Sequence, residues 1–227
     1  MTYSPLLAII TGVIEFAAAG WIFLNPGRGR KRILYPVGLI FLLLAGYQFA
    51  EVAVCSHPEI KLLTQLAFFN ITWLPPLGLW LGAQFNLPKS RWLRAAALID
   101  FAAALAFSVW IFAGPRAITH SVCQMVVARY YQAPLFDIAY GIFYQASLGL
   151  VVFAGAACMA SAQDSVLRKH WANLQAGILG FVLPALAVRV LVNEKPGLLP
   201  SVMCHFAFIL AVSLFFLILR ERKAGTA

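Results

Sequence analysis

Four ionisable side chains fall inside long apolar stretches of this chain: Glu15, Glu51, Asp100 and Arg189. A charged group in such surroundings is costly unless it has a partner, faces water or performs a function. Glu51 and Arg189 lie at matching depths in their stretches, so the sequence allows an ion pair between them. Asp100 is close enough along the chain to point toward Arg94. Glu15 lies near the middle of its stretch and is a candidate proton carrier or, alternatively, a buried structural carboxyl.

Other polar side chains gather at the depth of Glu51. Helical spacing places Gln48 on the same face as Glu51, and Tyr140 and Tyr144 form a stripe on another stretch. We expect an outward-facing polar pocket that holds a small ligand, and its predicted residues are Glu51, Arg189, His205, Gln48, Asn70, Tyr140 and Tyr144. The alternative is that these groups only form interhelical hydrogen bonds that hold the helices together.

Two cysteines follow apolar stretches on what we predict to be the outer side. Cys55 ends the second stretch and Cys123 lies in the longest connection, and such a pair in an oxidising compartment is usually a disulfide. The alternative is a metal site, because Cys55, His57, His120 and Cys123 form a Cys₂His₂ set. Their spacing is not one of the strong zinc patterns, so we favour the disulfide.

The connection that contains Cys123, residues 115–135, also has apolar residues at near-helical spacing. Ile118, Val122, Val126 and Arg129 would share one face of a helix. The pattern predicts either a short amphipathic helix on the membrane surface, able to cover the pocket, or a plain connector.

The composition excludes several classes of protein. The chain has 227 residues, of which 62% are hydrophobic and 11% are charged. Soluble domains have roughly 45–50% apolar and about 25% charged residues. A soluble enzyme, a secreted disulfide scaffold and a disordered chain are therefore excluded, and an integral membrane protein remains.

The apolar stretches predict an all-α fold, a seven-transmembrane helix bundle that forms a single domain over residues 1–227. A membrane-spanning helix needs about 20 mostly apolar residues. The expected spans are 5–24, 33–54, 62–82, 95–114, 136–160, 175–192 and 201–219. What remains is short connections and a short tail, with no room for a soluble domain.

The basic residues predict the orientation. Of the 17 lysines and arginines, 12 lie in the first, third and fifth connections and the C-terminal tail, four lie in the other connections, and Arg189 lies within a span. The positive-inside rule then places the N-terminus outside and the C-terminus in the cytoplasm. The first span has its basic cluster after it, which indicates an uncleaved span. Because the positive charge is divided among small juxtamembrane groups, the expected partner is the lipid bilayer and not nucleic acid.

Catalytic and cofactor motifs are absent from the sequence. No phosphate-binding loop, nucleophile elbow or His-Glu-x-x-His pattern occurs. All six lysines flank the spans, which excludes retinal in a Schiff base. We predict no cofactor, with a metal as the alternative, and we favour a protein that is not an enzyme.

Three short segments carry a resemblance to a known group. The start Tyr3-Ser4-Pro5, the pattern Tyr47-Gln48-Phe-Ala-Glu51 and the pattern Trp73-Leu-Pro75-Pro76 resemble segments of small bacterial seven-transmembrane proteins and of the seven-span sensor regions of histidine kinases. No kinase domain follows residue 219. The resemblance implies a stand-alone sensor or accessory subunit of the bacterial inner membrane, with a membrane or cytoplasmic signalling partner. It implies no catalytic residues.

The leading hypothesis is therefore a ligand-binding sensor or accessory protein with an outward polar pocket. One alternative is an intramembrane metal-dependent enzyme that uses outer-side His, Cys and Glu residues. A second is a proton-coupled transporter that uses Glu15 and Glu51, although the sequence has no internal repeat of the kind common in transporters.

Overall fold

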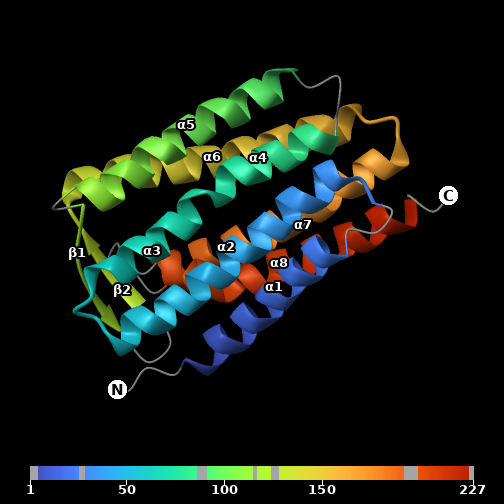
Figure 1. Cartoon of the computed structure of the whole chain (residues 1–227). Helices are drawn as coiled ribbons and strands as arrows, with labels where there is room; N and C mark the ends of the chain where they lie inside the picture. The colour runs from blue at the N-terminus through green and yellow to red at the C-terminus, as the bar shows by residue number, and fades with distance from the viewer. Residues whose placement is uncertain are drawn as a thin grey trace.

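The computed structural model is a bundle of long helices with one β-hairpin (Figure 1). It describes residues 5–25, 29–85, 91–114, 117–123, 128–191 and 199–224, without the side chains of 188–205 and 224. The elements are α1 (Leu6–Leu24), α2 (Lys31–Ser56), α3 (Lys61–Thr72), α4 (Leu74–Phe85), α5 (Arg91–Ala113), β1 (Ile118–Cys123), β2 (Ala128–Gln132), α6 (Pro134–Ser161), α7 (Ser165–Leu191) and α8 (Leu199–Ala224).

Helix α2 is the central helix, in contact with α1, α3, α4 and α8. The hairpin covers one end of the bundle, which we call the hairpin end, and α8 finishes at the opposite end (Figure 1). Helix α5 lies at one edge and packs on α4 and α6. This arrangement brings α2, α3 and α6 together beneath the hairpin.

Five segments of the described chain are long and apolar enough to cross a membrane: α1, α2, α3 with α4, α5 and α6. They coincide with the first five predicted spans. Helices α7 and α8 lie over the sixth and seventh predicted spans. The outward faces of α1, α5 and α6 carry exposed large apolar residues, such as Ile10, Ile99 and Ile142. A surface so apolar suits lipid and would be a liability in water.

The third span is divided into two helices at Trp73. Pro75 and Pro76 have no backbone N–H to donate, so the helical hydrogen bonds are interrupted here and α4 starts at Leu74. The ladder resumes where the Leu77 N–H donates to the Trp73 carbonyl. One turn before the break, the hydroxyl of Thr72 donates to the Phe68 carbonyl of its own helix at 2.6 Å.

The connection between α5 and α6 is a β-hairpin, so the predicted amphipathic helix is wrong. Strands β1 and β2 pair antiparallel, with an irregularity between Ile118 and His120. Their Thr, Val and Tyr residues favour strands, and burial alternates along β2, where Ala128 and Tyr130 face the bundle. The apolar residues at helical spacing therefore belong to the two faces of a pleated ribbon and not to one face of a helix.

Glycines allow the helices to approach one another closely. A Cβ atom on Gly82 of α4 would overlap the indole of Trp171 on α7, and a Cβ on Gly155 of α6 would overlap the amide of Gln175. Trp171 is fully buried. Small residues at helix crossings are the usual solution in membranes, where packing supplies much of the association energy.

We predict that Gly82→Ala destabilises the bundle. The gain in helix propensity, up to about 1 kcal/mol, is outweighed by overpacking, which typically costs 1–3 kcal/mol. The apparent Tm of the detergent-solubilised protein should fall. Gly141→Ala is the matched control because nothing lies within 4 Å of a Cβ at that position. An equal Tm for the two variants would contradict the packing argument.

Candidate functional site

A connected group of aromatic and hydroxyl side chains lies beneath the hairpin, and we call it the tyrosine network. The Tyr47 hydroxyl donates to that of Tyr130 at 3.3 Å, which joins α2 to β2. The hydroxyls of Thr72 and Tyr140 are 3.1 Å apart, which joins α3 to α6. The ring of Phe68 links the two pairs. Its centroid is 5.2 Å from that of Tyr130 and 5.6 Å from that of Tyr140.

The tyrosines of this network are buried although their hydroxyls are polar. Tyr140 stacks on Tyr144 one turn further along α6, so the network extends toward the middle of the bundle. A phenol both donates and accepts hydrogen bonds while its ring packs as an apolar group. The network therefore combines hydrogen-bonding hydroxyls with flat apolar rings.

Helix α2 adds the two predicted polar residues next to this network. Gln48 is 3% exposed and Glu51 is fully buried. Glu51 follows Tyr47 by one helical turn and shares its face. Gln48 lies toward α1, because its Cβ is 3.1 Å from the position of a Cβ on Gly12. Gln48 therefore lies on the side of α2 that packs on α1.

The other predicted pocket residues divide into three groups. Tyr140 and Tyr144 belong to the tyrosine network. Asn70 does not, since it is only partly buried, donates to the Leu66 carbonyl of its own helix at 2.8 Å and packs on Gly46 of α2. The side chains of Arg189 and His205 lie outside the described residues, so the Glu51–Arg189 ion pair stays a prediction.

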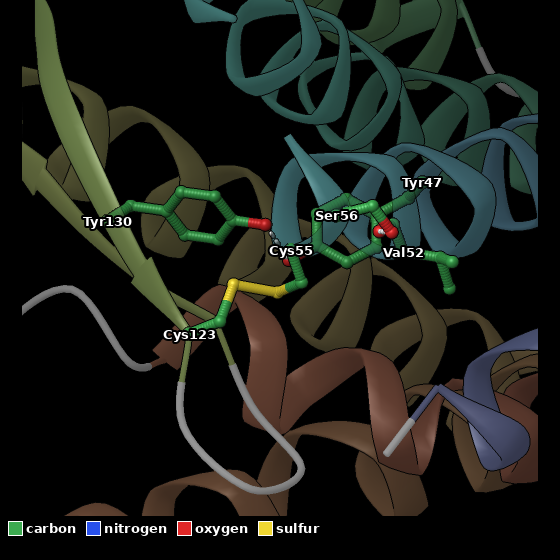
Figure 2. The surroundings of a disulfide bond; sticks show 6 residues. All are labelled: Tyr47, Val52, Cys55, Ser56, Cys123 and Tyr130. Carbon is green, nitrogen blue, oxygen red and sulfur yellow. Dashed lines mark hydrogen bonds between the residues drawn. A yellow bond between two sulfur atoms is a disulfide. The ribbon is translucent and has the colours of Figure 1, made fainter. Parts of the chain in front are cut away.

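A disulfide between Cys55 and Cys123 ties the hairpin to the end of α2 (Figure 2). The two Cα atoms are 5.6 Å apart, within the range of native disulfides. Figure 2 also shows Tyr130 reaching Tyr47 on the same side of the bond. A two-stranded ribbon is only marginally stable alone, so this covalent link and the buried Tyr130 are what hold the hairpin over the bundle.

This disulfide is the one that the sequence pattern favoured over a metal site. Disulfide sulfurs carry no thiolate, so in this form the Cys₂His₂ set has lost two of its four ligands. The two histidines have other neighbours: His57 Nδ1 lies 3.4 Å from Glu59, and His120 stacks on Tyr131 with ring centroids 4.2 Å apart.

We predict that Cys55→Ser or Cys123→Ser lowers the apparent Tm substantially. The bond closes a loop with a sequence separation of 68 residues. Loop-closure entropy alone gives a stabilisation of roughly 4 kcal/mol for that length. Reduction of the wild-type protein should produce the same fall, whereas Cys158→Ala, which changes the buried free cysteine, should respond to reduction like wild type. A wild-type Tm insensitive to reduction would refute the proposed role of the bond.

Glu15 lies apart from the tyrosine network. It is fully buried on the face of α1 that packs on α2, and neither carboxyl oxygen has a hydrogen-bond partner among the described residues. Asp100 does not point toward Arg94 as expected. Instead the Ser147 hydroxyl of α6 donates to it at 2.5 Å, which joins α5 to α6.

A second polar site, unforeseen from the sequence, lies at the opposite end of the bundle. Glu221 of α8 accepts hydrogen bonds from Arg30 Nε at 2.6 Å, from Arg30 Nη2 at 2.8 Å and from the Arg30 backbone N–H at 3.0 Å. His170 Nε2 of α7 lies 3.0 Å from the same carboxylate. We call these three residues the Glu221 clasp. They connect α8, α7 and the start of α2.

Glu221 and His170 are buried, whereas the Arg30 side chain is 42% exposed. Burial by itself would raise the pKa of the Glu221 carboxyl, but the hydrogen bonds from Arg30 and His170 and the charge of Arg30 outweigh it and lower that pKa below its ordinary range. The hydrogen bond to Glu221 in turn raises the pKa of Arg30. His170, which follows the basic pair Arg168 and Lys169 in the sequence, is only 2% exposed. The other ring nitrogen of His170, Nδ1, forms a hydrogen bond of 2.7 Å with the Val166 carbonyl.

The residues beside Glu221 join further helices. Arg220 donates to Asn173 of α7 at 2.9 Å. The Arg222 guanidinium lies over the Trp21 ring of α1, 3.7 Å from its centroid, and donates to the Asn25 carbonyl. The signal in the sequence was a single acidic residue in a basic run, Arg220-Glu221-Arg222-Lys223, which we had attributed to topology alone.

We predict that Glu221→Gln destabilises the protein by about 2 kcal/mol at neutral pH, because charge-assisted hydrogen bonds are lost while Arg30 stays partly in water. A carboxylate with a lowered pKa stabilises above its unfolded pKa of about 4.3 and loses that contribution as the pH falls toward the folded value. The difference in apparent Tm between wild type and variant should therefore narrow below about pH 4.3. Glu59→Gln removes an exposed carboxylate and should change nothing. A gap that widens in acid would contradict this assignment.

Comparison with known proteins gives no match: neither the protein-family models, nor the curated proteins, nor the solved structures contain one. The function has to be inferred from the two polar sites and from the helices that connect them.

Proposed function

We propose that the chain crosses the bacterial inner membrane seven times, with the hairpin end outside and the Glu221 clasp at the cytoplasmic surface. Helices α7 and α8, at 27 and 26 residues, are long enough for the last two spans. The distribution of the basic residues supports this orientation, since most of them flank the clasp end. The disulfide also suits an oxidising outer compartment.

Within this frame, the best-supported function is that of a sensor or accessory subunit which binds a small ligand at the hairpin end. One observation carries the proposal: α2 places buried Gln48 and Glu51 beside a tyrosine network that a disulfide-anchored hairpin covers. Buried polar groups inside a membrane are costly and commonly mark a binding site. The expected ligand is a small polar organic molecule with a flat or apolar part, because the site offers phenols and an acid.

The same two helices lead from this site to the clasp. Helix α2 carries Glu51 near one end and follows Arg30 at the other, about 32 Å apart at the helical rise of about 1.5 Å per residue. Helix α8 runs beside α2 and carries Glu221 at its clasp end. A ligand that moves α2 relative to α8 would strengthen or break the hydrogen bonds of the Glu221 clasp. A cytoplasmic signalling partner would detect that change.

The coupling can be tested with two spin labels in nanodiscs. Lys31→Cys on α2 and Lys223→Cys on α8, in a Cys158→Ala background, report the separation of the two helices near the clasp. We predict that Glu51→Gln and Gln48→Leu each change the distribution of label distances. Ser108→Ala is the matched control. Ser108 is buried on α5 near the hairpin end, and its hydroxyl donates within its own helix to the Ala104 carbonyl.

Ligand binding is tested on the same protein with free amino acids, short carboxylic acids and amines as probes. A compound present at 100 times its Kd stabilises the folded state by about 2.7 kcal/mol, which raises the Tm. Glu51→Gln should abolish that rise and Ser108→Ala should retain it. In the spin-label experiment, label distances that do not change in Glu51→Gln and Gln48→Leu would show that Glu51 and Gln48 are only packing residues.

A further inference from the structure

A groove of about 1120 Å³ runs along the bundle between α2, the α3–α4 pair and α5. Its lining includes no residue of the tyrosine network or of the Glu221 clasp. Its floor is aromatic: the Phe101 ring centroid is 6.1 Å from that of Trp73 and 6.4 Å from that of Trp80. Leu39 and Leu98 line it and are 38% and 60% exposed, so the groove is open to the surrounding acyl chains. Its walls are thus those of a site for a hydrocarbon chain.

One end of the groove is polar. Lys31 and Arg32 at the start of α2 line it, together with the buried Gln84 near the end of α4. The N-terminus of a helix carries partial positive charge, which adds to that of the two side chains. This end lies on the side of the clasp, which is the predicted cytoplasmic surface. The groove therefore combines a cationic end with an apolar length.

The basic residues differ in what they contact. Arg30, which directly precedes Lys31, forms an ion pair with Glu221. Lys31 and Arg32 form no hydrogen bond or ion pair with any residue that the structure describes, and both are exposed. Lys31 and Arg32 are therefore free to bind an anion at the mouth of the apolar groove. A phosphate group with a hydrocarbon chain attached has both the charge and the apolar part that this arrangement can bind.

The length of the groove matches one lipid leaflet. From Lys31 to Leu43 the lining follows α2 for 12 residues, about 18 Å at the helical rise. Half of the hydrocarbon core of a bilayer is about 15 Å thick. An acyl chain that lies along Pro36, Leu39 and Leu43 would reach the break at Trp73 with its phosphate at Lys31 and Arg32.

We propose that this groove binds one anionic phospholipid of the cytoplasmic leaflet. Lys31, Arg32 and Gln84 hold its phosphate group, and one acyl chain lies on the aromatic floor. The lipid would lie against α2, the helix that connects the two polar sites. The choice of leaflet rests on the proposed orientation, whereas the binding itself does not.

The test is native mass spectrometry of the whole protein released from nanodiscs made of phosphatidylglycerol and phosphatidylcholine in equal amounts. The wild type should retain one phosphatidylglycerol per chain in preference to phosphatidylcholine. Lys31→Gln with Arg32→Gln should lower that preference roughly thirtyfold, because each basic residue at a membrane surface strengthens the attraction of an anionic lipid by about fivefold. Arg168→Gln with Lys169→Gln is the matched control, which removes two exposed charges from the same end of the bundle.

A second pair of variants tests the apolar part. Leu98→Trp fills the groove from α5 and should abolish retention of either lipid. Leu105→Trp places the same side chain at an equally exposed position of α5 that does not line the groove, and it should behave as wild type. An unchanged Tm in each variant establishes that the fold is intact. The proposal fails if the two charge pairs act equally, or if Leu98→Trp retains the lipid. Neither result bears on the ligand site at the hairpin end.

Discussion

One buried carboxylate, that of Glu221, sets the arrangement of the helices at one end of the bundle. A charge removed from water must be fully hydrogen-bonded, and Glu221 obtains this from Arg30 and His170. Those partners come from the start of α2 and from α7, so three helices must meet for one carboxylate to be satisfied. Arg220 and Arg222 add α7 and α1 from the same turn of α8. The clasp thus orients helices whose apolar faces alone would allow them to slide or rotate.

The hairpin end is held by a different kind of interaction. There the disulfide and the buried Tyr130 fasten a short ribbon over α2, and hydroxyl groups pair with one another, Tyr47 with Tyr130 and Thr72 with Tyr140. The hydroxyl pairs of the tyrosine network are uncharged and individually weaker than the charge-assisted hydrogen bonds of the clasp. Weaker contacts suit the ligand response that we propose for this end, since elements of low local stability are the ones that move. Helix α2 contacts the hairpin at one end and begins beside the clasp at the other, so it connects the two ends of the bundle.

The sequence was a good guide to whatever depends on local pattern. The helix positions follow from runs of apolar residues, and Cys55 and Cys123 were the favoured disulfide pair. It failed where the deciding partner is distant along the chain. His170 appears to be a surface residue until Glu221 is placed beside it. Apolar residues of the connection 115–135 share a helical spacing, yet residues 118–123 and 128–132 form strands, with Tyr130 packed into the bundle and Cys123 bonded to α2.

By itself, the sequence determined that this is a helical membrane protein, because apolar length and the lack of charge are properties of the chain that no packing can alter. Only the tertiary structure decided which polar groups meet. The tyrosine network, the Glu221 clasp and the groove beside Lys31 and Arg32 each combine residues from separate helices. The rotation of each helix about its own axis selects these encounters, and that rotation is set by close packing such as that of Gly82 on Trp171.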